Sequence, residues 1–218
     1  MIRPVVVSDR AVALIGPARV RRKDFDLALS YADAVVAADG GAERVLGLGR
    51  LPDLVIGDFD SFNAGGRIPE DRLLRVDEQD STDFEKCLER ISAPRVLALG
   101  FLGRRIDHSL AVLSALAARP PGWCVLVGGH DVVVHCPARL ALDLPDASRV
   151  SLFPMAQVTA RSEGLEWPVA GVDFAPAGRI GTSNRVTGPV VLATDGPGML
   201  LILPRRAFRP LLAGLERG

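Results

Sequence analysis

The feature that most constrains the fold is a series of short, almost continuously apolar segments in the first part of the chain, separated by helical patterns. A strand that is apolar on both faces has to be covered on both, and the intervening helices supply that cover. We therefore expect an α/β domain with a mostly parallel sheet. The strands are expected at residues 11–16, 32–41, 52–60, 95–103 and 123–129, and the helices at 42–49, 82–91 and 107–118.

Beyond about residue 130 the pattern changes, because helical periodicity fades and short β-rich pieces alternate with turns rich in Gly, Pro, Asp and Asn. Such spacing is typical of an all-β antiparallel sandwich or a barrel-like domain. The sequence thus predicts two domains, an α/β domain over residues 1–128 and a β-rich domain over residues 129–218.

Composition narrows the class of protein. Of the 218 residues 48% are hydrophobic, enough for proper cores, and the formal net charge of zero gives no reason to expect nucleic acid or an anionic membrane as a partner. The sequence contains no apolar run of about 18 residues that would span a membrane and no signal-peptide pattern. We expect a cytoplasmic protein with reduced thiols, since Cys87, Cys124 and Cys136 lack metal-ligand spacing.

Two aspartates follow the apolar segment at residues 54–56. Side chains two residues apart in an extended chain share a face, so we expect Asp58 and Asp60 to converge while Phe59 turns toward the core. Converging carboxylates repel unless a cation lies between them, and Mg²⁺ prefers oxygen ligands. The pattern indicates a magnesium site, although a solvated acidic turn explains so short a motif at least as well.

Further polar groups follow strands or begin helices. Asp39 ends one expected strand beside Gly40, whose lack of a side chain lets a ligand touch the backbone. Thr82 and Glu85 have capping-box spacing at the start of a helix that also carries Asp83. The expected buried face of this helix comprises Phe84, Cys87, Leu88 and Ile91.

The stretch "GRRIDH" joins a glycine turn to another helix start. Arg104 and Arg105 beside a helix N-terminus suit a phosphate group, whereas Asp107 is equally explained as a plain N-cap. Acids that parallel strands bring to one edge of a sheet indicate metal-assisted chemistry on a polyphosphate. A P-loop kinase and a standard dinucleotide enzyme are disfavoured, because neither GxxxxGK[ST] nor a GxGxxG after a strand occurs.

In this order along the chain, the segments "AADGGA", "LPDLVIGDFDS", "QDSTDFEKCL", "GRRIDH", "SLFP" and "TSN" resemble the thiamin pyrophosphokinase family. The resemblance extends from about residue 35 to about residue 205, and its specificity lies in the order of the segments. It implies that pyrophosphate passes from ATP to thiamin with the help of Mg²⁺, giving AMP and thiamin diphosphate. It also implies an N-terminal ATP-binding domain, a C-terminal thiamin-binding domain, and a homodimer with shared active sites.

The resemblance further implies roles for individual residues. The catalytic set comprises Asp58, Asp60, Asp83, Asp107 and Arg104, and the first three of these hold the metal. The ATP side comprises Asp39, Gly40, Gln79, Thr82 and Arg105, and the thiamin side comprises Ser183 and Asn184.

Two departures from the family and two alternative functions stay open. The chain has "GFLGRRIDH" where many members carry a GATGGRxDH-like run, and "GMLLIL" where the animal enzymes place a tryptophan. Trp167 is a candidate aromatic partner of thiamin, but we favour a core position for it. A pyrophosphokinase for another hydroxymethyl heterocycle, such as a pterin, would change residues 130–218. A non-catalytic regulator that binds nucleotide or thiamin is disfavoured, because sensing needs fewer metal ligands.

Overall fold

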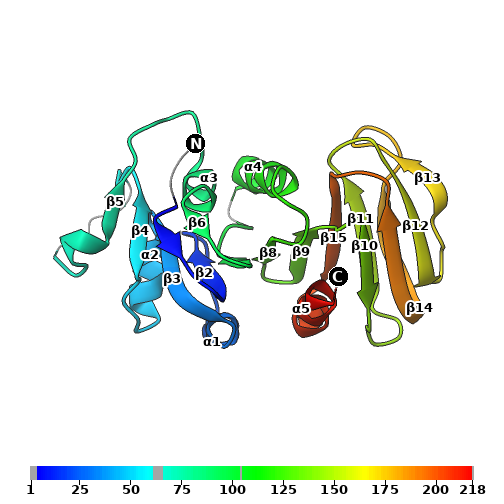
Figure 1. Ribbon diagram of the computed structural model, residues 1–218, viewed down its shortest axis with the longest axis horizontal. Helices are drawn as coiled ribbons and strands as arrows, with labels where there is room; N and C mark the ends of the chain where they lie inside the picture. Colours follow the sequence, from blue (N-terminus) through cyan, green and yellow to red (C-terminus); the bar gives the residue numbers. More distant parts are fainter. Residues whose placement is uncertain (1–3, 61–65, 104, 218) are drawn as a thin grey trace. The chain divides into compact units, whose positions relative to one another are not determined.

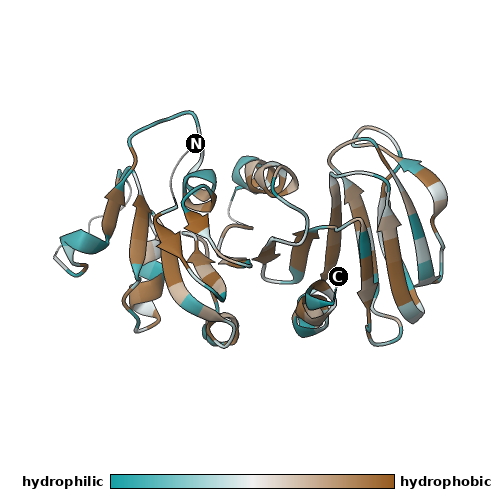
Figure 2. Cartoon of the chain, in the orientation of Figure 1, coloured by the Kyte–Doolittle hydropathy of each residue, from teal (hydrophilic) through white to brown (hydrophobic). Residues whose placement is uncertain are grey.

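The computed structural model describes residues 4–60, 66–103 and 105–217 (Figure 1). The chain forms two compact units, residues 1–115 and residues 116–218, each of which is described by itself. The expected domain boundary after residue 128 therefore falls inside the second unit, behind its first strand. In both units the apolar residues concentrate in the strands, which are mostly brown in Figure 2.

The sheet of the first unit has the strand order β5-β4-β3-β2-β7. All four of its pairings are parallel, and most residues of its three central strands are buried because helices and loops cover them. The short strands β1 (Val6–Val7) and β6 (Ile91–Ser92) form a separate parallel pair. The sheet strands are β2 (Ala11–Ile15), β3 (Ala32–Ala38), β4 (Leu54–Gly57), β5 (Leu73–Arg75) and β7 (Val96–Leu99).

The strand order of this sheet reverses at β2. The chain moves outward from β2 to β5 and then returns to β7, on the other side of β2. Open α/β sheets bind ligands at the carboxyl ends of their strands, beside such a reversal. The helices are α1 (Arg22–Leu29), α2 (Gly41–Gly47), η1 (Glu70–Arg72), α3 (Asp83–Leu88) and α4 (Ile106–Ala117).

The second unit is β-rich, as expected, and its strand order is β13-β12-β14-β11-β15-β9-β8. Its pairings are antiparallel, and the long strand β14 pairs first with β11 and then with β12 and β10. The strands are β8 (Cys124–Val127), β9 (Asp131–His135), β10 (Arg139–Leu142), β11 (Arg149–Pro154), β12 (Val158–Leu165), β13 (Ala170–Phe174), β14 (Gly181–Thr194) and β15 (Met199–Pro204).

The expectation of a purely β second domain is wrong at its C-terminal end. After the 3₁₀ turn η2 (Arg205–Ala207), helix α5 (Phe208–Glu216) packs on β10. Gly214 allows the close approach, because a Cβ there would lie 2.8 Å from the carbonyl oxygen of Ala141. The expected β character does hold for residues 150–205, all of which are described, since they contain no α-helix.

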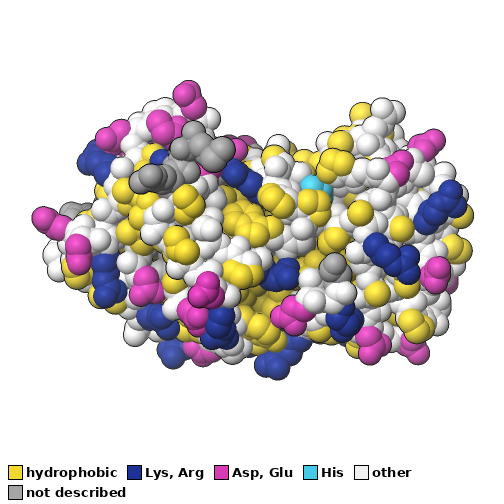
Figure 3. Space-filling view, in the orientation of Figure 1, with side chains coloured by type: hydrophobic (Ala, Val, Ile, Leu, Met, Phe, Trp, Pro, Cys, Tyr) yellow, Lys and Arg dark blue, Asp and Glu magenta, His cyan; other side chains and the backbone are white. Residues whose placement is uncertain are grey.

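The surface and the cysteines agree with the composition. On the face drawn in Figure 3, acidic and basic side chains are interspersed, as suits a formal net charge of zero. Cys87, Cys124 and Cys136 are buried and free of disulfides, and burial raises the pKa of Cys124 and of Cys136 to about 12. Within the described residues, no helix combines the length and the apolar character needed to cross a membrane.

Candidate active site

The two aspartates after β4 lie in a turn. β4 ends at Gly57, and Phe59 has a φ of 63°, in the left-handed region that a strand does not use. The backbone N–H of Asp60 donates a hydrogen bond of 3.2 Å to Asp58 Oδ1, which closes the turn. The expectation that Asp58 and Asp60 share one face of an extended chain is therefore wrong.

Both carboxylates nevertheless lie near β5. The pKa of Arg75 is raised first by its hydrogen bond with Asp77, and also by the negative charges of Asp60 and Asp58. The turn after β4 therefore still places two carboxylates at the carboxyl end of the sheet, although the backbone there is not extended as expected.

Asp39 occupies the equivalent place after β3. Its N–H donates a hydrogen bond of 2.9 Å to the carbonyl oxygen of Ile56, which holds it beside the end of β4. The Asp39 side chain is only 5% exposed, and a Cβ at Gly57 would lie 2.8 Å from its own Cβ. Asp39 therefore takes the space that Gly57 leaves. The adjacent Gly40 is the N-cap of α2.

Helix α3 begins with the expected capping box. Thr82 Oγ1 accepts a hydrogen bond from the backbone N–H of Glu85, and the Glu85 side chain accepts one of 3.0 Å from the N–H of Thr82. This use of Thr82 is structural, and its expected contact with a phosphate stays a prediction. Phe84, Cys87, Leu88 and Ile91 are all buried as expected, but the helix is shorter than expected, because α3 ends at Leu88 and Ile91 lies in β6.

The same helix buries a charge that the sequence reasoning missed. Lys86 is 2% exposed, and its Nζ lies 3.9 Å from Asp58 Oδ2 and 3.8 Å from Asp83 Oδ1. Two signals were available: Lys86 is one of only two lysines in a chain rich in arginine, and it follows Asp83 by one helical turn. We call Asp58 and Asp83, together with Asp39, whose charge acts on Asp83, the acidic cluster.

The charges in the acidic cluster shift its pKa values in opposite directions. The pKa of Asp83 is raised, chiefly by burial and next by the charge of Asp39, while Lys86 opposes the shift. The pKa of Asp58 is lowered, chiefly by the hydrogen bond from the Asp60 N–H, and further by Gln79 and Lys86. Gln79 Nε2 donates to Asp58 Oδ2 at 3.4 Å, which places this expected ATP-side residue at the cluster.

The donor chemistry of this place suits magnesium. Carboxylate oxygens are the ligands that Mg²⁺ prefers, and Asp39, Asp58 and Asp83 all lie near the carboxyl end of the sheet. Across residues 4–60, 66–103 and 105–217, however, no three acidic, histidine or cysteine side chains are grouped closely enough to hold a metal ion. The ammonium group of Lys86 lies between two of the carboxylates instead.

The predicted residues around α4 form a separate pair. Arg105 Nε donates to Asp107 Oδ1 at 3.1 Å, and both side chains are exposed. This pairing lowers the pKa of Asp107, and the N–H of His108 lowers it further. No hydrogen bond or ion pair between described residues joins Asp107 to the acidic cluster, and Arg104 lies outside the described residues. The catalytic roles of Asp107 and Arg104 and the ATP-side role of Arg105 remain predictions.

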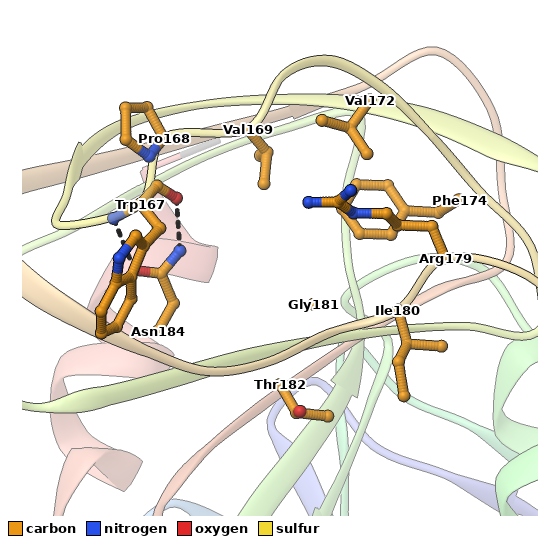
Figure 4. A pocket seen from close by; sticks show the side chains of 10 residues that line it. All are labelled: Trp167, Pro168, Val169, Val172, Phe174, Arg179, Ile180, Gly181, Thr182 and Asn184. Atoms are coloured by element: carbon orange, nitrogen blue, oxygen red, sulfur yellow. Dashed lines mark hydrogen bonds between the residues drawn. The ribbon is translucent and has the colours of Figure 1, made fainter.

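In the second unit, a cavity of about 230 Å³ opens where the start of β14 faces the segment between β12 and β13 (Figure 4). Its walls combine aromatic and aliphatic side chains with the amide of Asn184, the hydroxyl group of Thr182 and the guanidinium group of Arg179. The cavity is lined by Trp167, Pro168, Val169, Val172, Phe174, Arg179, Ile180, Gly181, Thr182 and Asn184.

The two predicted thiamin-side residues have different surroundings. Asn184 lines the cavity, and its amide holds the backbone of Trp167 by two hydrogen bonds, accepting from the N–H at 3.1 Å and donating to the carbonyl at 2.6 Å. Ser183 has a left-handed backbone and donates its N–H to Ser151 Oγ at 3.0 Å. Trp167 is 54% exposed, so the core position expected for it is wrong. Arg185 lies 5.9 Å from its ring centroid.

Comparison with family models matches both units. Residues 25–122 match the model described as the catalytic domain of thiamin pyrophosphokinase, and residues 134–197 match the model of its vitamin B1 binding domain. The second match contains the cavity and Asn184, and the first contains the whole acidic cluster.

The chain is also similar to individual thiamin pyrophosphokinases, both in sequence and in fold. The chain is 26% identical to thiamine pyrophosphokinase 1 of Arabidopsis thaliana over 196 residues, which cover 72% of each chain. It is 25% identical to thiamin pyrophosphokinase 1 of Caenorhabditis elegans over 219 residues, which cover 90% of this chain and 84% of that one. Its fold is similar to that of thiamin pyrophosphokinase from Candida albicans, with a TM-score of 0.75, 14% identity and coverage of 90% and 89%.

Proposed function

Because the chain belongs to the thiamin pyrophosphokinase family, we propose that it transfers the pyrophosphoryl group of ATP to the hydroxyl group of thiamin, giving thiamin diphosphate and AMP. The observation that carries the proposal is the paired match of a catalytic and a vitamin B1 binding model, one in each unit. Neither match favours a pterin substrate or a non-catalytic regulator.

The acidic cluster is the proposed phosphate end of the site. In this reaction the thiamin hydroxyl attacks the β-phosphorus of ATP, so charge spreads over the transferred group and has to be stabilised where it develops. Asp58, Asp60 and Asp83 would hold Mg²⁺, which neutralises phosphate charge when bound. Gln79 orients Asp58, and the exposed Arg105 is the proposed cation for the remaining phosphate oxygens.

The cavity in the second unit is the proposed thiamin end of the site. Asn184 is the proposed positioning residue of this cavity. Its amide forms two hydrogen bonds with the backbone of Trp167 and so holds Trp167 at the cavity wall. Exposed Trp167 offers an aromatic face, and Thr182 offers a hydroxyl group to a ring that carries nitrogen atoms. Ser183 does not line the cavity, and its role in thiamin binding rests on the family resemblance.

Two further parts of the proposal concern the whole protein. We keep a cytoplasmic homodimer as the working state, with each active site built from the acidic cluster of one chain and the thiamin end of its partner. Support for this arrangement comes from the family resemblance alone, so it needs a test of its own.

Incubation with ATP, Mg²⁺ and a panel of acceptors tests the function. We expect AMP release with thiamin, and none above background with a hydroxymethyl pterin or with no acceptor. AMP release that requires the pterin would replace the proposed acceptor. Binding of ATP and thiamin without any AMP release would favour the regulator.

A further inference from the structure

Lys86 places a positive charge inside the acidic cluster without forming a tight ion pair. Its Nζ lies 3.9 Å from Asp58 and 3.8 Å from Asp83, whereas charge-assisted hydrogen bonds measure about 2.7–2.9 Å. The Lys86 side chain is only 2% exposed. It projects from α3, and a capping box fixes the position at which this helix begins. The packing of α3, rather than attraction to one partner, therefore sets where the ammonium group lies.

Stability alone does not explain this charge. A buried ammonium group costs desolvation energy, and hydrophobic residues of similar volume often replace buried ion pairs without loss of stability. Position 86 lies between the buried residues Phe84 and Cys87, where methionine would fit the same apolar surroundings. The charge has to be explained by what it does to the carboxylates.

Three carboxylates without an internal cation would repel one another and the phosphates of ATP. They would also form a ready site for a divalent cation in the absence of any nucleotide. The ammonium group of Lys86 counters both effects, because it is close to two of the three carboxylates.

We propose that Lys86 is a positioning residue that serves as the permanent counter-ion of the acidic cluster. It offsets the repulsion between Asp58 and Asp83 and lowers their affinity for a divalent cation, so that the cation enters together with the nucleotide instead of binding to the protein alone. The inference rests on the proposed metal-assisted function.

Cation binding to the nucleotide-free full chain tests the inference, with Mn²⁺ as the probe in calorimetry or electron paramagnetic resonance. Lys86→Met removes the buried charge and keeps the length of the side chain. Lys23→Met is the matched control, because it removes the only other lysine, which is exposed on α1. We expect Lys86→Met to bind Mn²⁺ at least about tenfold more tightly than the wild type and the control. Mg²⁺ should then raise the melting temperature of Lys86→Met alone.

Circular dichroism establishes that each variant is folded, and Lys86→Gln takes the place of Lys86→Met if the latter is not. A folded Lys86 variant with the Mn²⁺ affinity of the wild type would overturn the inference. Tight Mn²⁺ binding by the nucleotide-free wild type would overturn it as well. AMP release with thiamin is measured separately, so a wild type without turnover removes the proposed function whatever the Mn²⁺ affinities are.

Discussion

Asp83 is the residue at which the proposed site conflicts with stability. Its carboxyl group is partly buried beside Asp39 and Asp58, and its pKa is raised because burial and these neighbouring charges disfavour the ionised form. A group with a raised pKa in the folded state destabilises the fold at pH values above that pKa. The cost disappears as the pH falls through the folded pKa toward the ordinary value of an aspartate, about 4.

Asp83→Asn should therefore stabilise the protein at neutral pH while it impairs turnover. We expect a gain in melting temperature of about 2 °C at pH 7.5, kept small by solvent screening of a side chain that is 39% exposed. The gain should shrink as the pH approaches about 4, where Asp83 itself becomes neutral. Thermal melts of both proteins across this pH range measure it, and a gain that grows on acidification would contradict the assigned pKa shift.

Asp58→Asn is expected to lower turnover of thiamin by at least about a hundredfold, on the scale of losing a major electrostatic contact in the transition state. The fold should survive, because Asp58 contributes no apolar burial. Steady-state assays over a range of Mg²⁺ concentrations check this result. Turnover like that of the wild type at low Mg²⁺ would remove Asp58 from the metal site.

Residue types at the site were predictable from the sequence, whereas their geometry was not. Asp39, Asp58 and Asp83 stand out because each follows a strand or begins a helix. The left-handed backbone of Phe59 could not be expected, since non-glycine residues rarely adopt it. The burial of Lys86 was missed because the search for helical periodicity counted apolar residues only.

At the scale of elements, Gly57 links two strand ends. It closes β4, and its missing Cβ leaves the space that Asp39 fills at the end of β3. The aspartates that follow β3 and β4 can therefore lie close together only because β4 ends in glycine. The sequence shows the glycine but not which side chain uses the space.

Gly57→Ala should displace Asp39, because the added Cβ would lie 2.8 Å from the Asp39 Cβ. We expect a loss of stability of about 1–3 kcal/mol, as for other overpacked sites, and a clear loss of turnover. Chemical denaturation and the AMP assay measure the two effects. Gly47→Ala is the matched control, because nothing lies within 4 Å of a Cβ at that position. A Gly57→Ala variant that behaves like this control would contradict the described packing.

Element prediction succeeded where the apolar pattern was dense and failed where it was sparse. β2, β3 and β7 lie within their expected ranges, whereas the strand expected to reach residue 60 ends at Gly57. α1 was missed because three charged residues open it and only a few of its positions are buried. α5 was missed because it follows a long β-rich stretch, although its apolar face packs on β10.

At the scale of the molecule, the change of sequence pattern correctly predicted an α/β part followed by a β-rich part. The position of the division depends on pairing rather than on composition. β8 has the apolar character of the preceding strands, but it pairs antiparallel with β9 and lies in the second unit. A sequence pattern shows that a strand is apolar, not which neighbour it joins.

The proposed dimer with shared sites makes a prediction about mixed subunits. Asn184→Ala releases the Trp167 backbone at the thiamin end, and Asp58→Asn impairs the phosphate end, so each homodimer should be nearly inactive. A heterodimer would contain one site with both ends intact, and mixing should therefore restore part of the activity. Differential tags verify subunit exchange. Verified heterodimers no more active than their parents would favour a site within one chain.

The long strand β14 has a consequence for how the second unit comes apart. Its first residues pair with β11, and its later residues pair with β12 and β10. Because one continuous backbone belongs to every one of these ladders, none of them can open far without straining the others. Amide protons along β14 should therefore exchange with solvent only when the whole unit unfolds. The residues at the start of this strand, which form a wall of the cavity, should show the same slow hydrogen exchange.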